Sequence, residues 1–273
     1  MHSKLFQIGP LEIHSYGLML ALSFLIGIYF SMYRAKKQGI DPNKIIDLSV
    51  IIVISAIFGS RFLYVIFHLD EFKGHWLDTI NPFQSSGQIG IAGLTMLGGL
   101  IAAVVFGLVY LKIKKLPVLK IADIAIPAIG IGIFITRIGC FLNGCCYGVP
   151  TNAPWGMVFP SESPAGFSFP GQAIHPAQLY SSLYGLIIFG LVLFLERYKK
   201  FDGFLLYIFF ILYGISRFIV DLFRYYESSM VLFQLGKFSI SVNQVISIVM
   251  ILMGCTLIYI NLVRKKNENK KIA

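Results

Sequence analysis

Residues 121–148 read IADIAIPAIGIGIFITRIGCFLNGCCYG, an apolar run that ends in a loop rich in glycine and cysteine. The run itself, residues 121–141, is long enough to cross a bilayer as a helix, and it carries one full positive charge, Arg137. A charge within a membrane-length segment usually faces a protein interior or a water-filled cavity and finds an anionic partner there. Arg137 is therefore the first predicted functional residue.

Six further apolar segments of similar length surround this one. Hydrophobic residues make up 56% of the 273 residues and charged residues only 13%, which is more apolar than ordinary soluble domains. The sequence thus predicts an all-α integral membrane protein in which residues 1–273 form a single seven-helix domain. The predicted transmembrane helices are residues 16–33, 45–67, 89–111, 121–141, 176–195, 203–223 and 240–262.

The positive charges indicate the orientation of these helices. Most of the 23 basic residues follow helices one, three, five and seven, which places them on one side of the membrane. By the positive-inside rule that side is the cytoplasm, so the N-terminus is predicted outside and the C-terminus inside. The net charge of +10 is then a feature of membrane topology, and no nucleic-acid partner is expected. The residues concerned are Arg34, Lys36, Lys37, Lys44, Lys112, Lys114, Lys115, Lys120, Arg197, Lys199, Lys200, Arg264, Lys265, Lys266, Lys270 and Lys271.

Four cysteines do not make a secreted disulfide framework in a chain this apolar. Cys255 lies in helix seven and is most simply a packing residue. The spacing Cys140-x4-Cys145-Cys146, with His175 downstream, offers four zinc ligands, yet adjacent cysteines are poor partners for tetrahedral closure on one metal ion. Neither a metal nor a cofactor is therefore predicted.

Polar residues of the first three helices are expected at their outer ends. Tyr16 begins helix one, where an interfacial aromatic residue is the simpler interpretation. Arg61 lies near the outer end of helix two, and snorkelling toward water is as simple an interpretation as a site role. Helix three opens with a run of small residues that includes Gly98 and Gly99, which suits either close approach of a lipid or tight helix packing. The outer loop of residues 68–88 is expected to lie on the membrane surface.

The second half of the chain continues this pattern. Residues 142–175 are rich in proline, glycine and serine, and they predict a small irregular extracytoplasmic cap inserted before helix five. In helix six, Arg217, Asp221 and Arg224 occupy relative positions 0, 4 and 7 and therefore share one face. A self-neutralising Arg-Asp pair explains two of them, and the surplus arginine requires an anion.

All seven helices thus carry their polar groups toward the outer half of the membrane, where they predict a cationic site. Guanidinium groups match phosphate oxygens with paired hydrogen bonds. The obvious anion at that depth is a phospholipid headgroup, with Arg137 and Arg217 on its phosphate. Asn143 and the glycine-rich backbone at Gly144 and Gly148 add hydrogen-bond donors for glycerol or phosphate oxygens.

The motif R-I-G-x-F-x-N-G-x-x-Y-G at residues 137–148 resembles the signature of the bacterial prolipoprotein diacylglyceryl transferases. The resemblance covers helices one to six and implies an enzyme of the bacterial inner membrane with its site facing the outer leaflet. It implies transfer of the diacylglyceryl group of phosphatidylglycerol to the lipobox cysteine of a prolipoprotein, giving a thioether and glycerol phosphate. Further similar blocks are Tyr16-Gly17, Gly59-Ser60-Arg61, Gly98-Gly99, His175-Pro176-x-Gln178-Leu179-Tyr180 and Arg217-Phe218-x-x-Asp221-x-Phe223-Arg224.

The resemblance also assigns roles to single residues. It makes Arg137 and Arg217 the essential arginines, Tyr16 the first-helix tyrosine, Asp221 the helix-six carboxylate and Gly148 the signature glycine. Three positions depart from the best-known pattern, because Cys140 replaces Asn, Cys145 replaces Glu and Leu97 replaces His or Tyr.

Leucine cannot accept a proton, so the base that activates the substrate thiol must lie elsewhere. The alternatives are His175, His68, Tyr16, or a cationic field that lowers the pKa of the thiol without a single base. Two other functions remain open for the chain as a whole. One is a non-catalytic phospholipid-binding paralogue, and the other is a membrane thiol oxidoreductase, although the latter normally uses a Cys-x-x-Cys pair that this chain lacks.

Overall fold

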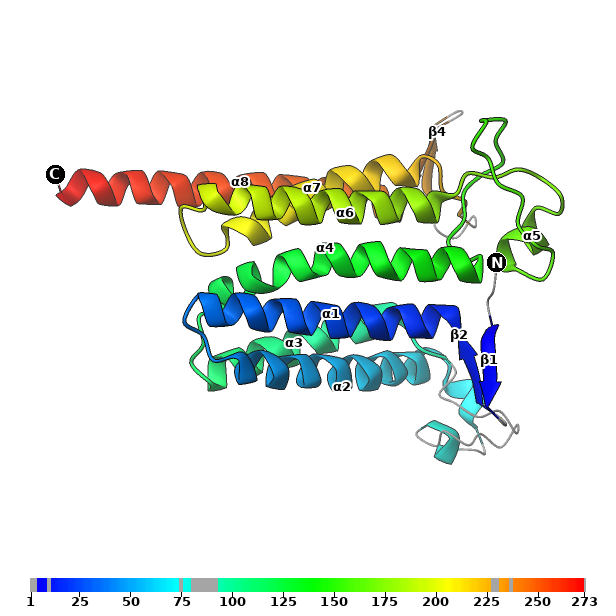
Figure 1. The fold of residues 1–273 in the computed structure, drawn as a ribbon, viewed down its shortest axis with the longest axis horizontal. Coiled ribbons are helices and arrows are strands. Elements are labelled where there is room, and N and C mark those ends of the chain that lie inside the picture. The colour runs from blue at the N-terminus through cyan, green and yellow to red at the C-terminus, as the bar shows by residue number, and fades with distance from the viewer. Residues whose placement is uncertain are drawn as a thin grey trace. The chain divides into compact units, whose positions relative to one another are not determined.

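Seven apolar helices make up most of the computed structural model (Figure 1). The structure describes residues 4–8, 11–73, 76–79, 93–226, 231–235 and 238–272. Within these ranges, seven helices are long and apolar enough to cross a membrane, which confirms the predicted class and number of spans. The single-domain organisation and the orientation of the termini stay predictions. The helices are α1 (Ser15–Lys37), α2 (Pro42–Phe67), α3 (Met96–Ile113), α4 (Val118–Asn143), α6 (Ala177–Leu195), α7 (Phe204–Asp221) and α8 (Val242–Ile272).

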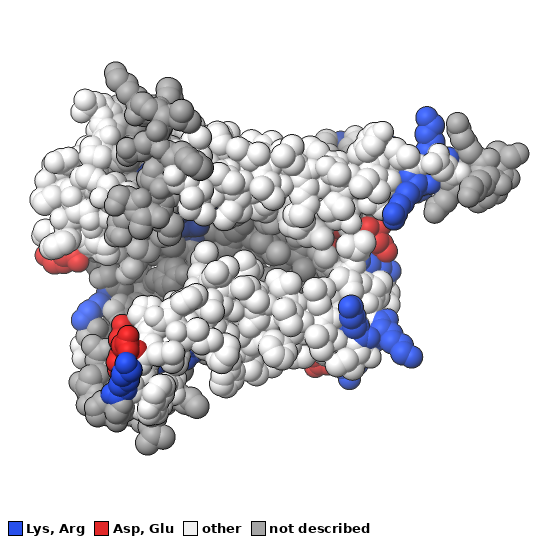
Figure 2. All heavy atoms as spheres, turned by 180° about the vertical axis from the view of Figure 1, so that it is seen from behind, with Lys and Arg blue, Asp and Glu red and all other residues white. Residues whose placement is uncertain are grey.

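The outer surfaces of these helices are apolar. Leu25, Phe58 and Phe62 are each about two-thirds exposed, at 66%, 67% and 69%. On the face drawn in Figure 2, the charged side chains lie mainly near helix ends and the surface between them is uncharged. Exposed leucine and phenylalanine on this scale are stable only against lipid.

The chain divides into two compact units, of which the first contains residues 1–31 and 122–273. In this unit α7 packs along both α6 and α8 (Figure 1). Its core is built from α4, α6 and α7, which explains why these segments are apolar on their inner faces as well. The core side chains are Ile126, Ala177, Tyr184, Ile188, Val192, Leu205, Phe209 and Val220.

Buried Asp123 on α4 fixes the start of α7. Its carboxylate accepts hydrogen bonds from the N–H groups of Gly203 (2.8 Å) and Leu206 (3.1 Å) and pairs with Lys199 at 3.0 Å. The first N–H groups of a helix have no intrahelical acceptor, and Gly203 at the N-cap has no side chain to supply one. Asp123 supplies it from a neighbouring helix.

The second unit contains residues 32–121 and is built on the antiparallel pair of α2 and α3. The two backbones approach closely at glycines. A Cβ atom added at Gly59 would lie 2.3 Å from the Ala102 Cβ, and one at Gly98 would lie 2.3 Å from the Gly59 carbonyl oxygen. Near the other end of the pair, the Tyr110 hydroxyl donates to the Asp47 carboxylate at 3.0 Å.

Several element boundaries differ from the predictions. Helix α3 begins at Met96 and not at residue 89, because Gly93 has a left-handed backbone (φ 72°) and Thr95 donates its N–H to Ser60. Two hairpins were not predicted: β1 (Lys4–Ile8) pairs with β2 (Leu11–His14) before α1, and β3 (Val231–Leu235) pairs with β4 (Phe238–Ser241) before α8. Two short 3-10 helices, Leu69–Phe72 and Trp76–Thr79, occupy part of the predicted surface loop, and much of its remainder lies outside the described residues.

The predicted cap, residues 142–175, is mostly irregular but has its own core. Ile174 pairs with Pro150 and with Met157, and it packs with Phe159 and Ala165. The prediction of an irregular cap is wrong at one place, the short helix α5 (Pro164–Ser168). Ser163 caps this helix by accepting a hydrogen bond from the Gly166 N–H at 3.1 Å, and proline at the first helical position suits a helix start.

Candidate functional site

Arg137 lies on the last turns of α4, which ends at Asn143. Its guanidinium is partly buried, within electrostatic reach of Tyr184 on α6 and Tyr213 on α7. Among the described residues, no carboxylate forms an ion pair with Arg137. A charge inside a membrane protein needs an anionic partner, so Arg137 is available to an anionic ligand.

Tyr16 begins α1 next to this part of α4. The two helices approach closely at Gly139, where an added Cβ atom would lie 3.3 Å from the Tyr16 Cα. The Tyr16 hydroxyl is within electrostatic reach of Arg137 and of the cysteines at positions 140, 145 and 146, and the residue is 37% exposed. The structure therefore brings Tyr16 and Arg137 close to each other.

A glycine turn ends α4 and folds the chain back on itself. The Gly144 N–H donates to the Phe141 carbonyl at 3.2 Å, and the Cys145 N–H donates to the Cys140 carbonyl at 3.1 Å. This is the Schellman pattern, which requires a left-handed residue just after the helix, and Gly144 has a φ of 71°. An added Cβ at Gly144 would also lie 2.6 Å from the Ser163 Cβ, so the turn and the cap both require glycine here.

The same turn gathers three cysteines. The Sγ atoms of Cys140, Cys145 and Cys146 all lie within 4.8 Å of one another. The spacing had indicated that adjacent cysteines converge poorly, but Cys146 has a left-handed backbone (φ 59°), which changes the direction of the second side chain. Hydrogen bonds from the Cys140 and Cys145 thiols, together with the nearby charges of Arg224 and Arg137, lower the pKa of Cys146 far below its ordinary value.

A second arginine is fixed at the end of α7. Arg217 pairs with Asp221 at 3.4 Å, as the sequence predicts, and both contact the Tyr226 hydroxyl, to which Arg217 donates and which donates to Asp221. The Ser241 hydroxyl donates to the other carboxylate oxygen of Asp221. Asp221 is thus fully engaged, and it orients the Arg217 guanidinium.

The sequence contains a signal for Ser241 that was not used. Ser241-Val-Asn-Gln244 is a capping box, in which the Gln244 N–H donates to the Ser241 hydroxyl at 3.1 Å and the Ser241 N–H donates to the Gln244 side chain at 3.0 Å. This motif marks the start of α8 and places Ser241 at its N-cap. Tyr226 has no comparable signal, because its contact depends on the turn after α7.

Arg224 does not continue the helical face predicted for Arg217 and Asp221. Helix α7 ends at Asp221, and Arg224 lies on the following extended segment, where it forms a bridge with Gly148. The Gly148 N–H donates to the His175 carbonyl at 3.0 Å, and an added Cβ at Gly148 would lie 2.5 Å from the Phe223 carbonyl oxygen. Gly148 therefore allows three segments, the loop after α4, the lead-in to α6 and the end of α7, to pair side by side.

His175 is held in place by its neighbours. Its Nδ1 lies 3.0 Å from the Tyr180 hydroxyl, which also accepts from the Trp155 indole at 2.8 Å, and its ring packs on Phe223. Burial lowers the pKa of His175, so the neutral imidazole dominates at ordinary pH. Within the described residues, no hydrogen-bond partner is present at Nε2.

Four buried polar atoms of this unit have no hydrogen-bond partner in the described structure: Gln178 Oε1, Tyr184 Oη, Arg217 Nη1 and Arg224 Nε. The second amide atom of Gln178, Nε2, donates to the Cys145 carbonyl at 2.8 Å, and the Asn143 side chain lies beside the Cys145 sulfur. An unpaired buried donor costs about 1–3 kcal/mol, and more when it is charged. One buried guanidinium nitrogen without a partner on each of two arginines indicates a site for an anion.

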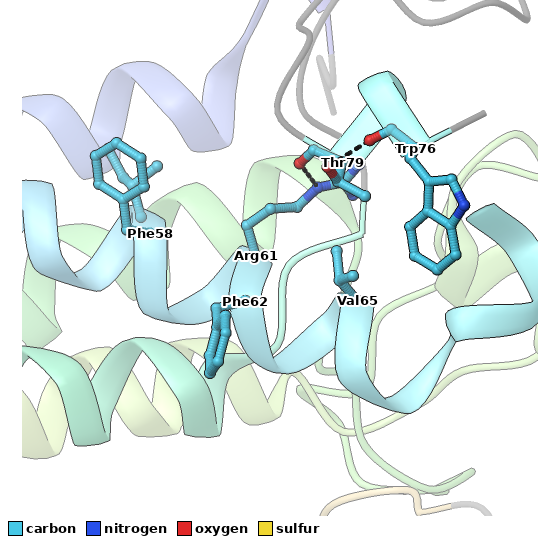
Figure 3. Close-up of a pocket in the computed structure, with 7 residues that line it drawn as sticks. Phe58, Arg61, Phe62, Val65, Trp76 and Thr79 are labelled. Atoms are coloured by element: carbon cyan, nitrogen blue, oxygen red, sulfur yellow. Dashed lines mark hydrogen bonds between the residues drawn. The ribbon is translucent and has the colours of Figure 1, made fainter. Parts of the chain in front are cut away.

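The remaining predicted residues lie in the second unit. Arg61 is 8% exposed and does not snorkel. Its Nε donates to the Thr79 carbonyl at 2.9 Å and its Nη1 to the Gly93 carbonyl at 3.3 Å, and Figure 3 shows the side chain extending toward Thr79. Arg61 thus ties the loop after α2 to the lead-in of α3. It borders an apolar cavity of about 510 Å³ whose other lining residues are Ile57, Phe58, Phe62, Val65, Trp76 and Thr79.

Gly98 and Gly99 serve helix packing in this unit. An added Cβ at Gly99 would lie 2.3 Å from the Ser60 hydroxyl oxygen, and Gly98 touches the α2 backbone. The sequence left two interpretations of Gly98 and Gly99, tight helix packing and contact with a lipid. The structure supports tight packing, and lipid contact stays a prediction. Leu97 is 58% exposed beside them. His68 stacks on Tyr64, with ring centroids 4.1 Å apart, and its Nδ1 lies 3.0 Å from the Tyr64 carbonyl.

Comparisons with known proteins agree on one family. The profile of the family described as prolipoprotein diacylglyceryl transferase matches residues 3–260, which extends past the six helices of the sequence resemblance into α8. A phosphatidylglycerol–prolipoprotein diacylglyceryl transferase of Campylobacter hominis is 31% identical over 274 residues, covering 97% of this chain and 92% of that protein. Proteins of the same name from Fusobacterium nucleatum and Finegoldia magna are 32% identical over 308 residues, covering 100% of each chain, and 35% identical over 253 residues, covering 92% of each.

Proposed function

This chain belongs to the prolipoprotein diacylglyceryl transferase family, and we propose that its unpaired arginine donors hold the phosphate of the lipid substrate. The enzyme transfers the diacylglyceryl group of phosphatidylglycerol to the lipobox cysteine thiol of a bacterial prolipoprotein. The sulfur–carbon bond forms as the carbon–oxygen bond to phosphate breaks, so a thioether is produced and glycerol phosphate leaves. Its partners are phosphatidylglycerol, the prolipoprotein and the surrounding bilayer.

The observation that carries the proposal is the pair of buried guanidinium donors without partners, Arg217 Nη1 and Arg224 Nε. Phosphate is the anion that guanidinium groups match best, because two N–H donors meet two oxygens. Arg137, which has no carboxylate partner among the described residues, is the third cation available to it. Asp221 keeps Arg217 in position without occupying all of its donors. The oxygens of Asp221 also accept hydrogen bonds from Tyr226 and Ser241, so Nη1 of Arg217 is left for the phosphate.

This arrangement stabilises the leaving group. Negative charge increases on the phosphate as the carbon–oxygen bond breaks, and fixed donors in a low-dielectric site stabilise such charge more than water does. Gly144 and Gly148 shape the loop that closes the site, and Asn143 offers an amide to glycerol or phosphate oxygens. Tyr16 and His175 are the proposed proton-handling groups of this unit, with Nε2 as the available ring nitrogen of His175.

We place the site at the outer leaflet of the bacterial cytoplasmic membrane. Tyr16 and Gln178 lie at the starts of α1 and α6, whereas Arg137 and Arg217 lie toward the ends of α4 and α7. Helices that alternate in direction thereby bring these residues to one end of the unit, while most Lys and Arg residues follow the opposite ends.

A transfer assay with purified protein tests the proposal. Phosphatidylglycerol labelled in its acyl chains and a lipobox peptide are supplied in nanodiscs, and the lipidated peptide is measured. We expect Arg217→Lys to lower the rate by roughly 10²–10³-fold, in the range seen when one transition-state donor is removed. Arg197→Lys, on the opposite end of the unit, is the matched control and should remain near the wild-type rate.

A lipid-binding paralogue without catalysis predicts a different result. Such a protein would bind phosphatidylglycerol tightly but form no thioether with any lipobox peptide. Wild-type protein that binds the lipid and yields no product would refute the transferase proposal, and unchanged turnover in Arg217→Lys would refute the phosphate-holding role.

A further inference from the structure

The three-cysteine cluster at the end of α4 has the composition of a metal site. Cys140, Cys145 and Cys146 each offer one sulfur atom, and the three sulfurs lie within 4.8 Å of one another. The cluster is built into the fold, because the Schellman turn at Gly144 and the left-handed backbone of Cys146 bring the sulfurs together. Nothing in the transfer reaction as derived above uses these thiols.

The distances suit a zinc ion with small adjustments. Zinc binds thiolate at about 2.3 Å in tetrahedral geometry, so its sulfur ligands lie about 3.8 Å apart. The cluster therefore needs to close by at most about 1 Å, which side-chain rotation provides. His175 is not the fourth ligand, since its ligand atoms are not part of this group and its Nδ1 lies beside Tyr180.

A centre of three thiolates and one divalent ion suits the charges that surround it. Such a centre carries a net charge of −1, and the cationic side chains of Arg137 and Arg224 are the nearby charges that offset it. Cys140 is buried, while Cys145 and Cys146 are partly exposed, so one side of the cluster faces away from the core. Three protein ligands and one accessible side are the features of a catalytic zinc site, in which the fourth position is left for water or substrate.

We propose that Cys140, Cys145 and Cys146 bind one zinc ion, and that its fourth position takes the thiol of the lipobox cysteine. This role rests on the proposed transferase function. On binding, the S–H bond of the substrate breaks, its proton passes to solvent by way of the proposed proton-handling groups Tyr16 and His175, and the sulfur becomes a thiolate ligand, because thiols bind metal ions in deprotonated form. The sulfur then forms its bond to the diacylglyceryl carbon as glycerol phosphate departs, and no oxidant or reductant is needed.

Metal analysis tests the site without any assay of activity. Wild-type protein is purified with reductant from zinc-supplemented cells, and zinc per chain is measured by mass spectrometry. We expect about one zinc ion per chain in wild type and in Cys255→Ser, the control thiol on α8, and at least a fivefold lower content in Cys140→Ser, Cys145→Ser or Cys146→Ser. Cobalt substitution should give sulfur-to-cobalt absorption bands in the near ultraviolet for the wild type and for Cys255→Ser only.

Two results would overturn the site. One is wild-type protein without zinc, or with a disulfide between two of the three cysteines after anaerobic preparation. The other is zinc content equal in Cys255→Ser and in all three cluster variants, which would place the metal elsewhere. The zinc content of the wild-type protein can refute the site by itself, so the test does not depend on whether the cysteine variants fold.

X-ray absorption spectroscopy tests the fourth position. We expect three sulfur ligands and one lighter ligand in the zinc-loaded protein, and four sulfur ligands after a lipobox peptide is added. A serine-substituted peptide is the control and should leave three sulfurs. An unchanged spectrum with the cysteine peptide refutes substrate coordination.

The activity of zinc-free protein separates this proposal from the proposed function. If removal of zinc by a chelator abolishes transfer and added zinc restores it, the role is supported. Full transfer by zinc-free protein would leave the transferase function intact and refute the role of zinc. A zinc centre that gains the peptide sulfur in a protein that never forms thioether would instead refute the transferase function and retain the site.

Discussion

At the scale of single residues, the site is organised by carboxylate and hydroxyl groups that leave arginine donors free for a ligand. Asp221 accepts from Tyr226 and Ser241, so it does not neutralise every donor of Arg217. A carboxylate whose oxygens accept several hydrogen bonds can orient a cation and still leave some of that cation's donors free. Tyr226 connects the two and is therefore the residue whose removal tests this arrangement.

We expect Tyr226→Phe to lower both stability and transfer. The substitution leaves Asp221 one donor short and frees Arg217 to rotate, at a cost of about 1–3 kcal/mol for the unsatisfied buried group. Thermal unfolding in detergent and the transfer assay measure the two effects. Tyr225→Phe is the control, because Tyr225 stacks on Tyr147 and its hydroxyl has no hydrogen-bond partner among the described residues. If the two variants had the same thermal stability and the same transfer rate, the role of Tyr226 in linking Arg217 to Asp221 would be contradicted.

His175 gives the protein a pH dependence of defined sign. Burial lowers its pKa below 6.5, so at acid pH the unfolded chain binds a proton that the folded chain resists. Burial of neutral His175 therefore lowers the free energy of unfolding only when the pH falls below about 6.5, and it has no such cost at higher pH. We expect the thermal midpoint of the wild type to fall more steeply than that of His175→Gln as the pH is lowered below about 6.5. The exposed His14→Gln serves as the control, and parallel curves for wild type and His175→Gln would show that burial of His175 has no such effect.

At the scale of elements, residue type alone identified the helices but not how they end. Apolar length predicts seven spans, because backbone groups in lipid must be satisfied within a helix. Helix ends depend instead on local hydrogen bonds, such as those that end α7 at Asp221 and move Arg224 onto the Gly148 bridge. The cysteine cluster could not be predicted from spacing for the same reason. It depends on the positive φ of Gly144 and of Cys146, and the latter is rare for a residue with a side chain.

The pairing of α2 with α3 predicts different effects for two glycines of α3. Gly98→Ala places a Cβ 2.3 Å from the Gly59 carbonyl oxygen, whereas Gly107→Ala places one 3.6 Å from the nearest side-chain atom, an ordinary contact. We expect Gly98→Ala to cost about 1–3 kcal/mol through overpacking and Gly107→Ala to be neutral or slightly stabilising. Thermal unfolding measures both. If Gly98→Ala kept full stability and raised only the KM for phosphatidylglycerol, its role would be lipid contact.

At the scale of the whole molecule, composition was sufficient for the class and the number of spans, and the resemblance was sufficient for function. The family match extends over residues 3–260, so it also reaches into α8 (Val242–Ile272). The two hairpins were not predicted, because short strands next to long apolar helices give too few alternating residues to be distinguished from helix ends. Which side each end of the molecule faces stays a prediction from the basic residues.

Labelling in intact cells tests that orientation. Single cysteines are introduced at Glu162, which is exposed in the cap, and at Lys266, which is exposed near the end of α8. We expect an impermeant maleimide to label Glu162→Cys directly and Lys266→Cys only after the membrane is permeabilised. Labelling is assigned by peptide mass so that native cysteines do not interfere. The reverse pattern would invert the topology.

The bridge between Pro150 and Ile174 means that the cap leaves the helical part of its unit and returns to it at neighbouring points. Extra chain inserted between such points does not pull the helices apart, and each doubling of a flexible loop costs only about 0.6 kcal/mol in closure entropy. Gly171 is the suitable position, because it is exposed, has a φ of 67°, and a Cβ atom added there would meet nothing within 4 Å. An epitope tag placed there would let antibody binding to spheroplasts count the enzyme molecules that have the predicted orientation.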